Sequence, residues 1–188
     1  MNFSTYTNYF QEILNAEHPI APYNNPDYFN YTKLNWSRMN RWLKHGELLP
    51  EAKEAINDVT TKQQWIIITE PWCGDAAHVV PFLQMISALN PLIEVTYELR
   101  DSEPFRINDY LTNGGKSIPK LIIRDEDGHD LATWGPRPVA AKELHEQLKA
   151  DEISAEEIKT TLQKWYNDDH GVAIQREITA LLKQLPVA

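Results

Sequence analysis

The apolar pattern from residue 65 onward restricts the fold of this 188-residue chain more than any other feature of its sequence. Residues 65–69 (WIIIT) form a short, β-branched, continuously apolar run, which is typical of a strand buried on both faces. Residues 74–89 then place apolar side chains at helical intervals. Residues 92–99 alternate apolar and polar side chains, which predicts a strand with one exposed face.

Two more strands are predicted at 120–124 and 130–134, separated by an acidic, glycine-containing loop that indicates a hairpin. A short helix is predicted over 104–112, and another helix over 138–149. The order is therefore β-α-β-α-β-β-α. A helix between the first two strands makes them parallel with a right-handed crossover, so the fold class is α/β with a mixed four-stranded sheet.

Helices are also predicted on both sides of this core, at 4–16, 33–46 and 50–60, and at 154–167 and 171–185. Residues 17–32, rich in proline and asparagine, are expected to be irregular. Ser154 and Glu157 have the spacing of a capping box. We interpret the chain as one domain, with a helical N-terminal extension (1–62), a core (63–150) and a helical C-terminal extension (151–188).

Composition narrows the classes of function. The chain is 42% hydrophobic and 24% charged, as in an ordinary globular protein, and its net charge of -9 disfavours binding to nucleic acid or to an anionic membrane. No signal-peptide pattern is present, and no apolar run approaches the roughly 20 residues of a membrane-spanning helix. The single cysteine cannot form an intramolecular disulfide, so we expect a cytoplasmic protein. The sequence does not predict an oligomeric state.

The only cysteine, Cys73, lies in the motif PWCGD (71–75), between the first strand and the helix that follows. Backbone N–H groups at a helix start stabilise a thiolate, so this position favours a reactive cysteine over a buried, inert one. Asp75 stabilises the helix start but competes with the thiolate for the same positive field. His78 lies about 140° round the helix from Cys73, which argues against a catalytic pair. Cys73, Asp75 and His78 do not have a zinc-site spacing, and we expect neither a metal nor a bound cofactor.

Three motifs carry a resemblance to a known family. PWCG (71–74), SIPKL (117–121) and the WG pair at 134–135 occur in the order found in the thioredoxin fold, and the resemblance covers residues 65–150. More narrowly, PWCGD, YLTNGGKSIPK (110–120) and WGPRP (134–138) resemble a bacterial group of thioredoxin family proteins of similar length. The resemblance implies a thioredoxin fold with helical extensions.

The resemblance also implies a site. The peptide bond between Ile118 and Pro119 should be cis, which leaves the Ile118 backbone free to pair with an extended peptide. The loop after the fourth strand should border the same groove. We expect Arg137 to point toward the Cys73 thiolate or an anionic partner, or else to pair with Glu70 or another acid. Glu70 and Asp75 are interpreted as modulating residues. The predicted substrate-binding residues are Trp72, Ile118, Pro119, Trp134, Gly135 and Arg137.

Two departures from the thioredoxin pattern shape the functional hypotheses. Ala76 stands where the second cysteine would be, and Ile67 where a buried acid would be. The first hypothesis is a monothiol thiol–disulfide oxidoreductase, or a redox-responsive protein, whose partner is a protein or peptide. With a single cysteine, it needs an external thiol, and a low-molecular-weight thiol could serve as this co-substrate. The alternative is a non-catalytic peptide- or protein-binding module in which Cys73 is incidental. A third hypothesis assigns an assembly role to the helical extensions.

Overall fold

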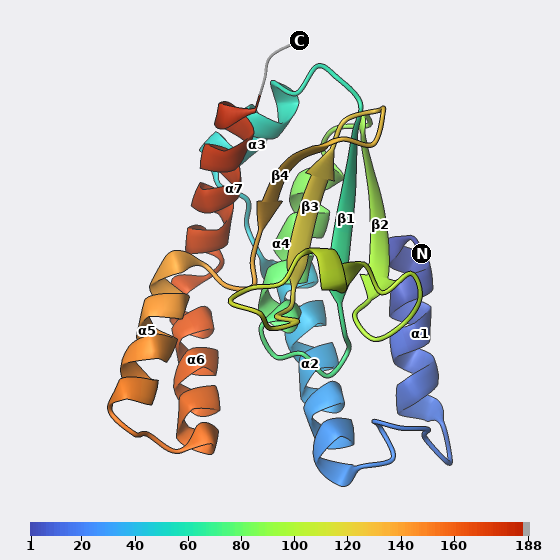
Figure 1. Ribbon diagram of the computed structural model, residues 1–188, viewed down its shortest axis with the longest axis vertical. Helices are drawn as coiled ribbons and strands as arrows, with labels where there is room; N and C mark the ends of the chain where they lie inside the picture. Colours follow the sequence, from blue (N-terminus) through green and yellow to red (C-terminus); the bar gives the residue numbers. More distant parts are fainter. Residues whose placement is uncertain (186–188) are drawn as a thin grey trace.

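The computed structural model describes residues 1–185 and is built around a four-stranded mixed sheet with strand order β2-β1-β3-β4 (Figure 1). Strand β1 is parallel to β2 and antiparallel to β3, and β3 and β4 form an antiparallel hairpin. This arrangement confirms the predicted α/β fold class. The strands are β1 (Gln63–Thr69), β2 (Ile93–Leu99), β3 (Lys120–Arg124) and β4 (Asp130–Trp134).

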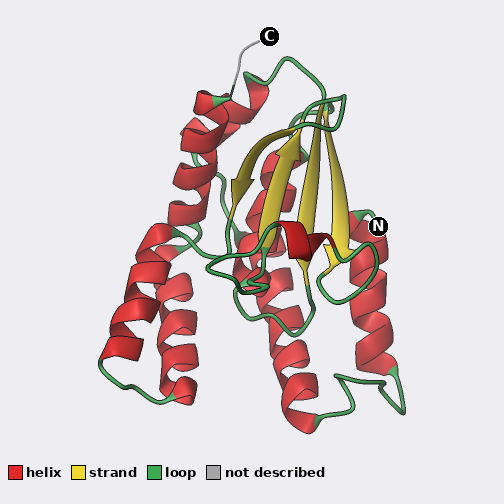
Figure 2. Cartoon of the chain, in the orientation of Figure 1, coloured by secondary structure: helices red, strands yellow, loops and turns green. Residues whose placement is uncertain are grey.

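Helices surround the sheet (Figure 2), and those predicted from apolar periodicity are found within a few residues of their expected limits. They are α1 (Phe3–Asn15), α2 (Pro26–His45), α3 (Pro50–Asn57), α4 (Ala76–Ser87), α5 (Val139–Ala150), α6 (Ala155–Asp169) and α7 (Val172–Gln184). The predicted capping box is present at the start of α6, where the Glu157 N–H donates to Ser154 Oγ at 3.3 Å.

Two predicted segments are wrong. Residues 17–32 are not irregular throughout, because α2 begins at Pro26: proline suits the first helical position, and the Asn25 side chain accepts a hydrogen bond from the Asp27 N–H at 2.8 Å. The helix predicted over 104–112 is only the four-residue 3-10 helix η1 (Arg106–Asp109). Phe105 has a left-handed φ of 53°, so the helix cannot extend toward the N-terminus.

The core forms where the two central strands are buried on both faces. Ile67 in β1 and Leu121 and Ile123 in β3 are fully buried, as the continuous apolar runs predict. The edge strand β2 is covered from outside: the Met1 amino group donates to Tyr97 O at 2.9 Å, and the Tyr97 N–H donates back to Met1 O at 2.7 Å. The Tyr97 ring also stacks on Tyr6 of α1. The N-terminal extension therefore protects a sheet edge that would otherwise be open to pairing.

The C-terminal helices have two roles. Helix α7 packs against α3, and its Gln175 side chain accepts from the Leu49 N–H at 2.7 Å and donates to Glu47 O at 3.1 Å. Helices α5 and α6 form a hairpin that projects beside α2 (Figure 1). The chain turns sharply between α6 and α7 at His170 and Gly171, both with left-handed φ. This turn directs α6 toward the end of the sheet where Cys73 lies.

Candidate functional site

Cys73 lies in the loop between β1 and α4, just before the first helical turn. Its N–H donates to Glu70 O at 3.0 Å, and its carbonyl accepts from the Ala77 N–H at 3.3 Å. The side chain is buried, with 7% of its surface exposed, and its thiol donates to Ile118 O at 3.4 Å. The Ile118–Pro119 bond is cis, as predicted. The structure thus brings together Cys73 and Ile118, which are 45 positions apart in the sequence.

The electrostatic surroundings of Cys73 oppose the predicted thiolate. Burial, and secondly the negative charge of Asp75, raise the pKa of the Cys73 thiol to about 12. The N–H groups of Ala76 and Asp75 and the Arg137 cation act in the opposite direction, as expected at a helix start. Burial is the larger influence, so the balance favours the protonated thiol, and the predicted reactivity of Cys73 stays a prediction.

Asp75 joins three parts of the chain at the site. It forms an ion pair with Arg137 at 2.7 Å, and it accepts a hydrogen bond from the Tyr166 hydroxyl at 2.9 Å. Arg137 belongs to the loop after β4 and Tyr166 to α6. Of the alternatives for Arg137, the structure therefore shows pairing with an acid, and the acid is Asp75 rather than Glu70.

Glu70 lies close to Cys73 in the sequence, and its side chain is buried and does not line the pocket beside Cys73. It is 5% exposed, and its carboxylate accepts the Asp101 N–H at 3.2 Å, which ties the loop after β2 to the cysteine loop. Burial raises the pKa of Glu70 to about 7. Because it does not reach the surface beside Cys73, Glu70 positions the loop instead of contacting a ligand.

His78 is held in a single neutral form. Its Nδ1 accepts from Trp42 Nε1 at 2.9 Å, so the proton must lie on Nε2, which then donates to Gln163 Oε1 at 2.7 Å. The ring also stacks on Tyr166, with centroids 4.6 Å apart. Burial lowers the pKa of His78 to about 4. These contacts link α2, α4 and α6, and they agree with the expectation that His78 does not form a catalytic pair with Cys73.

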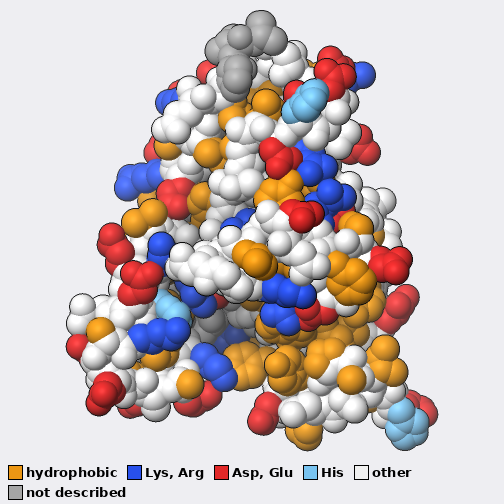
Figure 3. All heavy atoms as spheres, in the orientation of Figure 1, with side chains coloured by type: hydrophobic (Ala, Val, Ile, Leu, Met, Phe, Trp, Pro, Cys, Tyr) orange, Lys and Arg blue, Asp and Glu red, His pale blue; other side chains and the backbone are white. Residues whose placement is uncertain are grey.

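A pocket of about 650 Å³ opens beside Cys73 (Figure 3), where the surface is hollowed between the α5–α6 hairpin and α2. Trp72, Cys73, Ile118 and Arg137 line it, as predicted. Three predicted residues do not. Trp134 donates its indole N–H to Glu177 at 2.7 Å, and Gly135 and Pro119 pack against each other so closely that an added Cβ on Gly135 would collide with the Pro119 carbonyl.

Sequence reasoning missed much of the pocket wall. The first part of α2 contributes Asn25, Asp27, Tyr28 and Tyr31, and α6 contributes Lys159, Leu162 and Gln163. The Asn25-Pro26 pair carries the signal of a helix start, which would have revealed the longer α2. No local signal indicates that α6 lies opposite α2.

The pocket combines aromatic rings with cations. The Arg100 guanidinium lies 4.6 Å from the Trp72 ring centre, and the Lys159 ammonium 4.9 Å from that of Tyr31. The Tyr28 ring meets Trp72 edge-on, with centroids 5.8 Å apart. Such a surface can hold an apolar or aromatic group beside a charged one.

A separate cluster of candidate ligand atoms lies in the β3–β4 hairpin. Asp125, Asp127 and His129 approach one another there. The Asp125 carboxylate accepts the N–H groups of Asp127 and His129 at 3.0 and 2.8 Å, so the cluster is accounted for by the closure of the turn.

Comparison with known proteins gives the family. A thioredoxin family model matches residues 23–149. The chain belongs to the thioredoxin family. A structure of a protein of unknown function from Pseudomonas aeruginosa is 18% identical, with a TM-score of 0.51, and the match covers 93% of this chain and 90% of the other. An HIV epitope scaffold is 16% identical, with a TM-score of 0.56, over 99% and 100% of the two chains.

Both structures share the fold of this thioredoxin family chain along almost their full lengths, including the helical extensions. The comparison with curated proteins gave no match. Among residues 1–185, no helix is both long enough and apolar enough to cross a membrane.

Proposed function

We propose that this thioredoxin family protein binds an extended peptide segment of a partner in the pocket beside Cys73, with Cys73 resting as a neutral thiol. The observation that carries the proposal is the buried thiol, which donates to Ile118 O at the pocket wall. Burial raises the pKa of the thiol to about 12, which keeps the thiolate rare at pH 7. The greater nucleophilicity of a high-pKa thiolate offsets only part of this loss, so we expect thiol–disulfide exchange at Cys73 to be slower than at an ordinary thiol.

The backbone at Ile118 supports peptide binding. Within residues 1–185 the Ile118 N–H donates no hydrogen bond, and its carbonyl accepts one from the Cys73 thiol. An extended peptide can pair with such a backbone as an added strand. Trp72 and the two tyrosines of α2 offer aromatic contacts for the side chains of that peptide.

A displayed library of random cysteine-free peptides, selected on the full chain, tests this proposal. We expect the selected peptides to bind equally well to Cys73→Ser, and about tenfold more weakly to Trp72→Ala. Trp134→Ala is the matched control, because its indole lies outside the pocket and binding should not change. The proposal fails if no peptide is selected, or if Trp72→Ala and Trp134→Ala behave alike.

A second candidate is one-cysteine thiol–disulfide exchange, which the contact of Cys73 with the pocket and the opposing influence of Arg137 favour. The Cys73 thiolate would attack one sulfur of a peptide disulfide, break the S–S bond and form a mixed disulfide, while the departing thiolate takes up a proton. The thiolate of an external low-molecular-weight thiol would then attack the peptide sulfur of the mixed disulfide and break its bond to Cys73. Cys73 leaves as a thiolate and takes up a proton, and the external thiol stays bonded to the peptide as a new disulfide.

Intact-mass measurement with a mild disulfide separates the two candidates. A mixed disulfide at Cys73 that forms faster than one on free cysteine at pH 7 favours exchange, and a slower reaction favours peptide binding. Ala76→Cys supplies the missing second thiol, and measurable dithiol reductase activity in that variant would show that the rest of the site can support exchange. We also propose that the protein is cytoplasmic and belongs to the bacterial group that shares the PWCGD motif, a proposal supported by its single free cysteine and by the motif itself.

A further inference from the structure

We infer that the pocket beside Cys73 selects acidic peptide segments. This inference rests on the proposed peptide-binding function and names the class of peptide that the pocket accepts.

The charge of the pocket is opposite to that of the protein. The chain as a whole has 27 acidic and 18 basic residues, yet the pocket is lined by four basic side chains and two acidic ones. Figure 3 shows lysine and arginine atoms gathered around the hollow between α2 and the α5–α6 hairpin. The four cations are Arg100, Lys116, Arg137 and Lys159, and the two acids are Asp27 and Asp75.

The ion pairs of these residues leave positive charge available. Arg137 and Asp75 neutralise each other at 2.7 Å, and Arg100 is paired with Asp101. The charged side chains that remain in the lining are two lysines, Lys116 and Lys159, and one acid, Asp27. Lys116 is exposed and has no ion pair within residues 1–185. Lys159 has only a distant partner, Glu156 at 3.6 Å, on the exposed face of α6. Exposed pairs of that kind are weak and can be exchanged for a ligand carboxylate.

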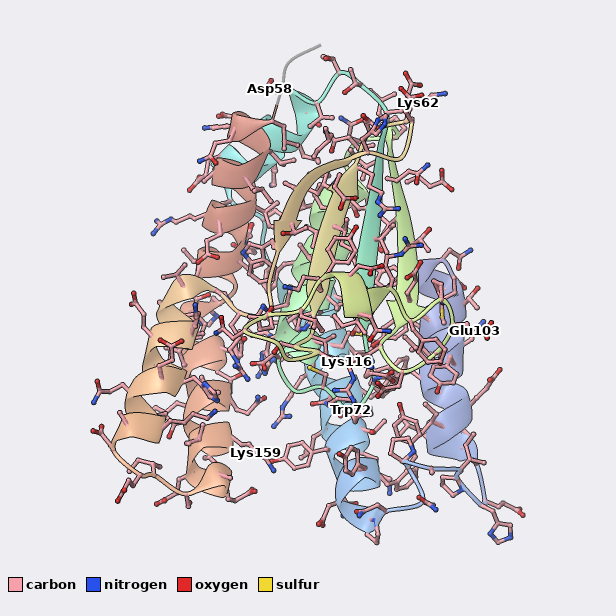
Figure 4. The ribbon with its side chains drawn as sticks, in the orientation of Figure 1. Asp58, Lys62, Trp72, Glu103, Lys116 and Lys159 are labelled. Carbon is pink, nitrogen blue, oxygen red and sulfur yellow. The ribbon has the colours of Figure 1, made fainter. Side chains whose placement is uncertain are left out.

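Lys116 and Lys159 come from different walls. Lys116 belongs to the loop before Ile118, while Lys159 extends from α6 toward α2 (Figure 4). A segment that pairs with the Ile118 backbone therefore passes between two ammonium groups. Because side chains alternate along an extended peptide, carboxylates can face these cations while apolar side chains face Trp72 and Tyr31.

The neutral thiol fits an anionic occupant. A thiolate would repel a neighbouring carboxylate, whereas the protonated Cys73, already bonded to Ile118 O, adds no negative charge to the pocket. The electrostatic state of the cysteine and the charge of the pocket wall are therefore consistent with the same ligand.

The shape of the cavity favours a segment of chain over a small acid. A second hollow of about 520 Å³ continues between α2 and α6 and shares Asp27, Tyr31, Lys159 and Gln163 with the first. Arg38, Glu156 and the exposed Leu34 are among the residues that line this extension. Together the two hollows give a groove that a peptide can follow beyond Ile118. Its excess of positive charge lies in the first hollow, because acids balance the cations of the second.

The experiment uses the peptides selected on the full chain from the random library. We expect aspartate and glutamate to be enriched in them several-fold over the unselected library. In fluorescence anisotropy, replacing the acids of one selected peptide by their amides should weaken binding about tenfold, and raising the salt should weaken the acidic peptide only. The double variant Lys116→Gln/Lys159→Gln should also bind the acidic peptide about tenfold more weakly. The pair Lys164→Gln/Lys183→Gln is the matched control, since it also removes two exposed lysine charges, both outside the pocket.

The outcomes separate this inference from the proposed function. Peptides that are selected but show no acidic enrichment, or that bind the double variant and the control alike, overturn the acidic preference and leave peptide binding standing. If no peptide is selected, both fall. Competition by free succinate as effective as that by the acidic peptide would assign the pocket to a small dicarboxylate and overturn the inference.

Discussion

The substitution Asp75→Asn tests the electrostatic account of Cys73. It removes the second-largest cause of the raised thiol pKa while changing only one atom of the side chain. It also releases Arg137 from its 2.7 Å ion pair, and a free guanidinium favours the thiolate. Both effects have the same sign, so the pKa of Cys73 should fall.

The size of the effect can be worked out from general values. Removal of one neighbouring carboxylate lowers a pKa by roughly 1 unit, or about 1.4 kcal/mol. At pH 8 the thiolate fraction then rises about tenfold, while its intrinsic nucleophilicity falls about threefold. Alkylation of Cys73 by iodoacetamide should therefore become about threefold faster. The lost ion pair should lower Tm by a few degrees without unfolding the protein.

The assay is the pseudo-first-order alkylation rate, followed by intact mass. Tyr166→Phe is the control: it removes the hydroxyl that bonds Asp75 but keeps the carboxylate charge, so it tests whether loosening of α6 alone exposes the sulfur. The reasoning is refuted if Asp75→Asn leaves the rate unchanged or lowers it. It is also refuted if Tyr166→Phe raises the rate equally, since exposure would then control reactivity.

Three stability predictions follow from other buried groups, each measured by urea unfolding. The pKa of Glu70 is raised to about 7 from an ordinary 4.5, which means that the folded protein binds this proton more tightly than the unfolded chain does. The free energy of unfolding should therefore fall by up to about 3 kcal/mol as pH rises from 4.5 to 7. Glu70→Gln should remove this pH dependence. The pKa of His78 is lowered to about 4 from an ordinary 6.5, so the free energy of unfolding should fall by up to about 3 kcal/mol as pH falls from 6.5 to 4. His78→Leu should remove this pH dependence, and at pH 8 it should lower the free energy of unfolding by about 2 kcal/mol because two hydrogen bonds are lost. Gly171→Ala should lower the free energy of unfolding by about 3 kcal/mol, because the added Cβ would collide with the Phe82 ring. Gly128→Ala, also at positive φ but in open space, should lower it by only about 1 kcal/mol. Equal losses of unfolding free energy in the two glycine variants would contradict the prediction for Gly171. A pH dependence of stability that Glu70→Gln or His78→Leu leaves unchanged would contradict the prediction for that residue.

The sequence predicted those parts of the structure that local patterns control. The continuous apolar runs around Ile67 and Ile122 predicted central strands, because side chains buried on both faces must all be apolar. The family resemblance carried by the motifs around Cys73 and Pro119 implied a cis bond in the groove beside the cysteine, and the structure places the sulfur 3.4 Å from Ile118 O.

The remainder depends on tertiary contacts that no local pattern reports. The partner of the Trp134 indole, Glu177, is 43 positions away in α7, and this bond turns Trp134 out of the pocket. The pKa of Cys73 is set by burial, whereas the sequence shows only the helix start that opposes it. Lys159 reaches the pocket because the turn at Gly171 directs α6 beside α2.

The most direct test of the central claim is the titration of Cys73 by NMR, with ¹³C label at its Cβ. As the only cysteine, it gives a single, unambiguous signal. The account predicts a Cβ shift that stays at the thiol value from pH 5 to about pH 10, because burial keeps the sulfur protonated. A titration with a midpoint near or below pH 7 would contradict the account and identify Cys73 as an active nucleophile.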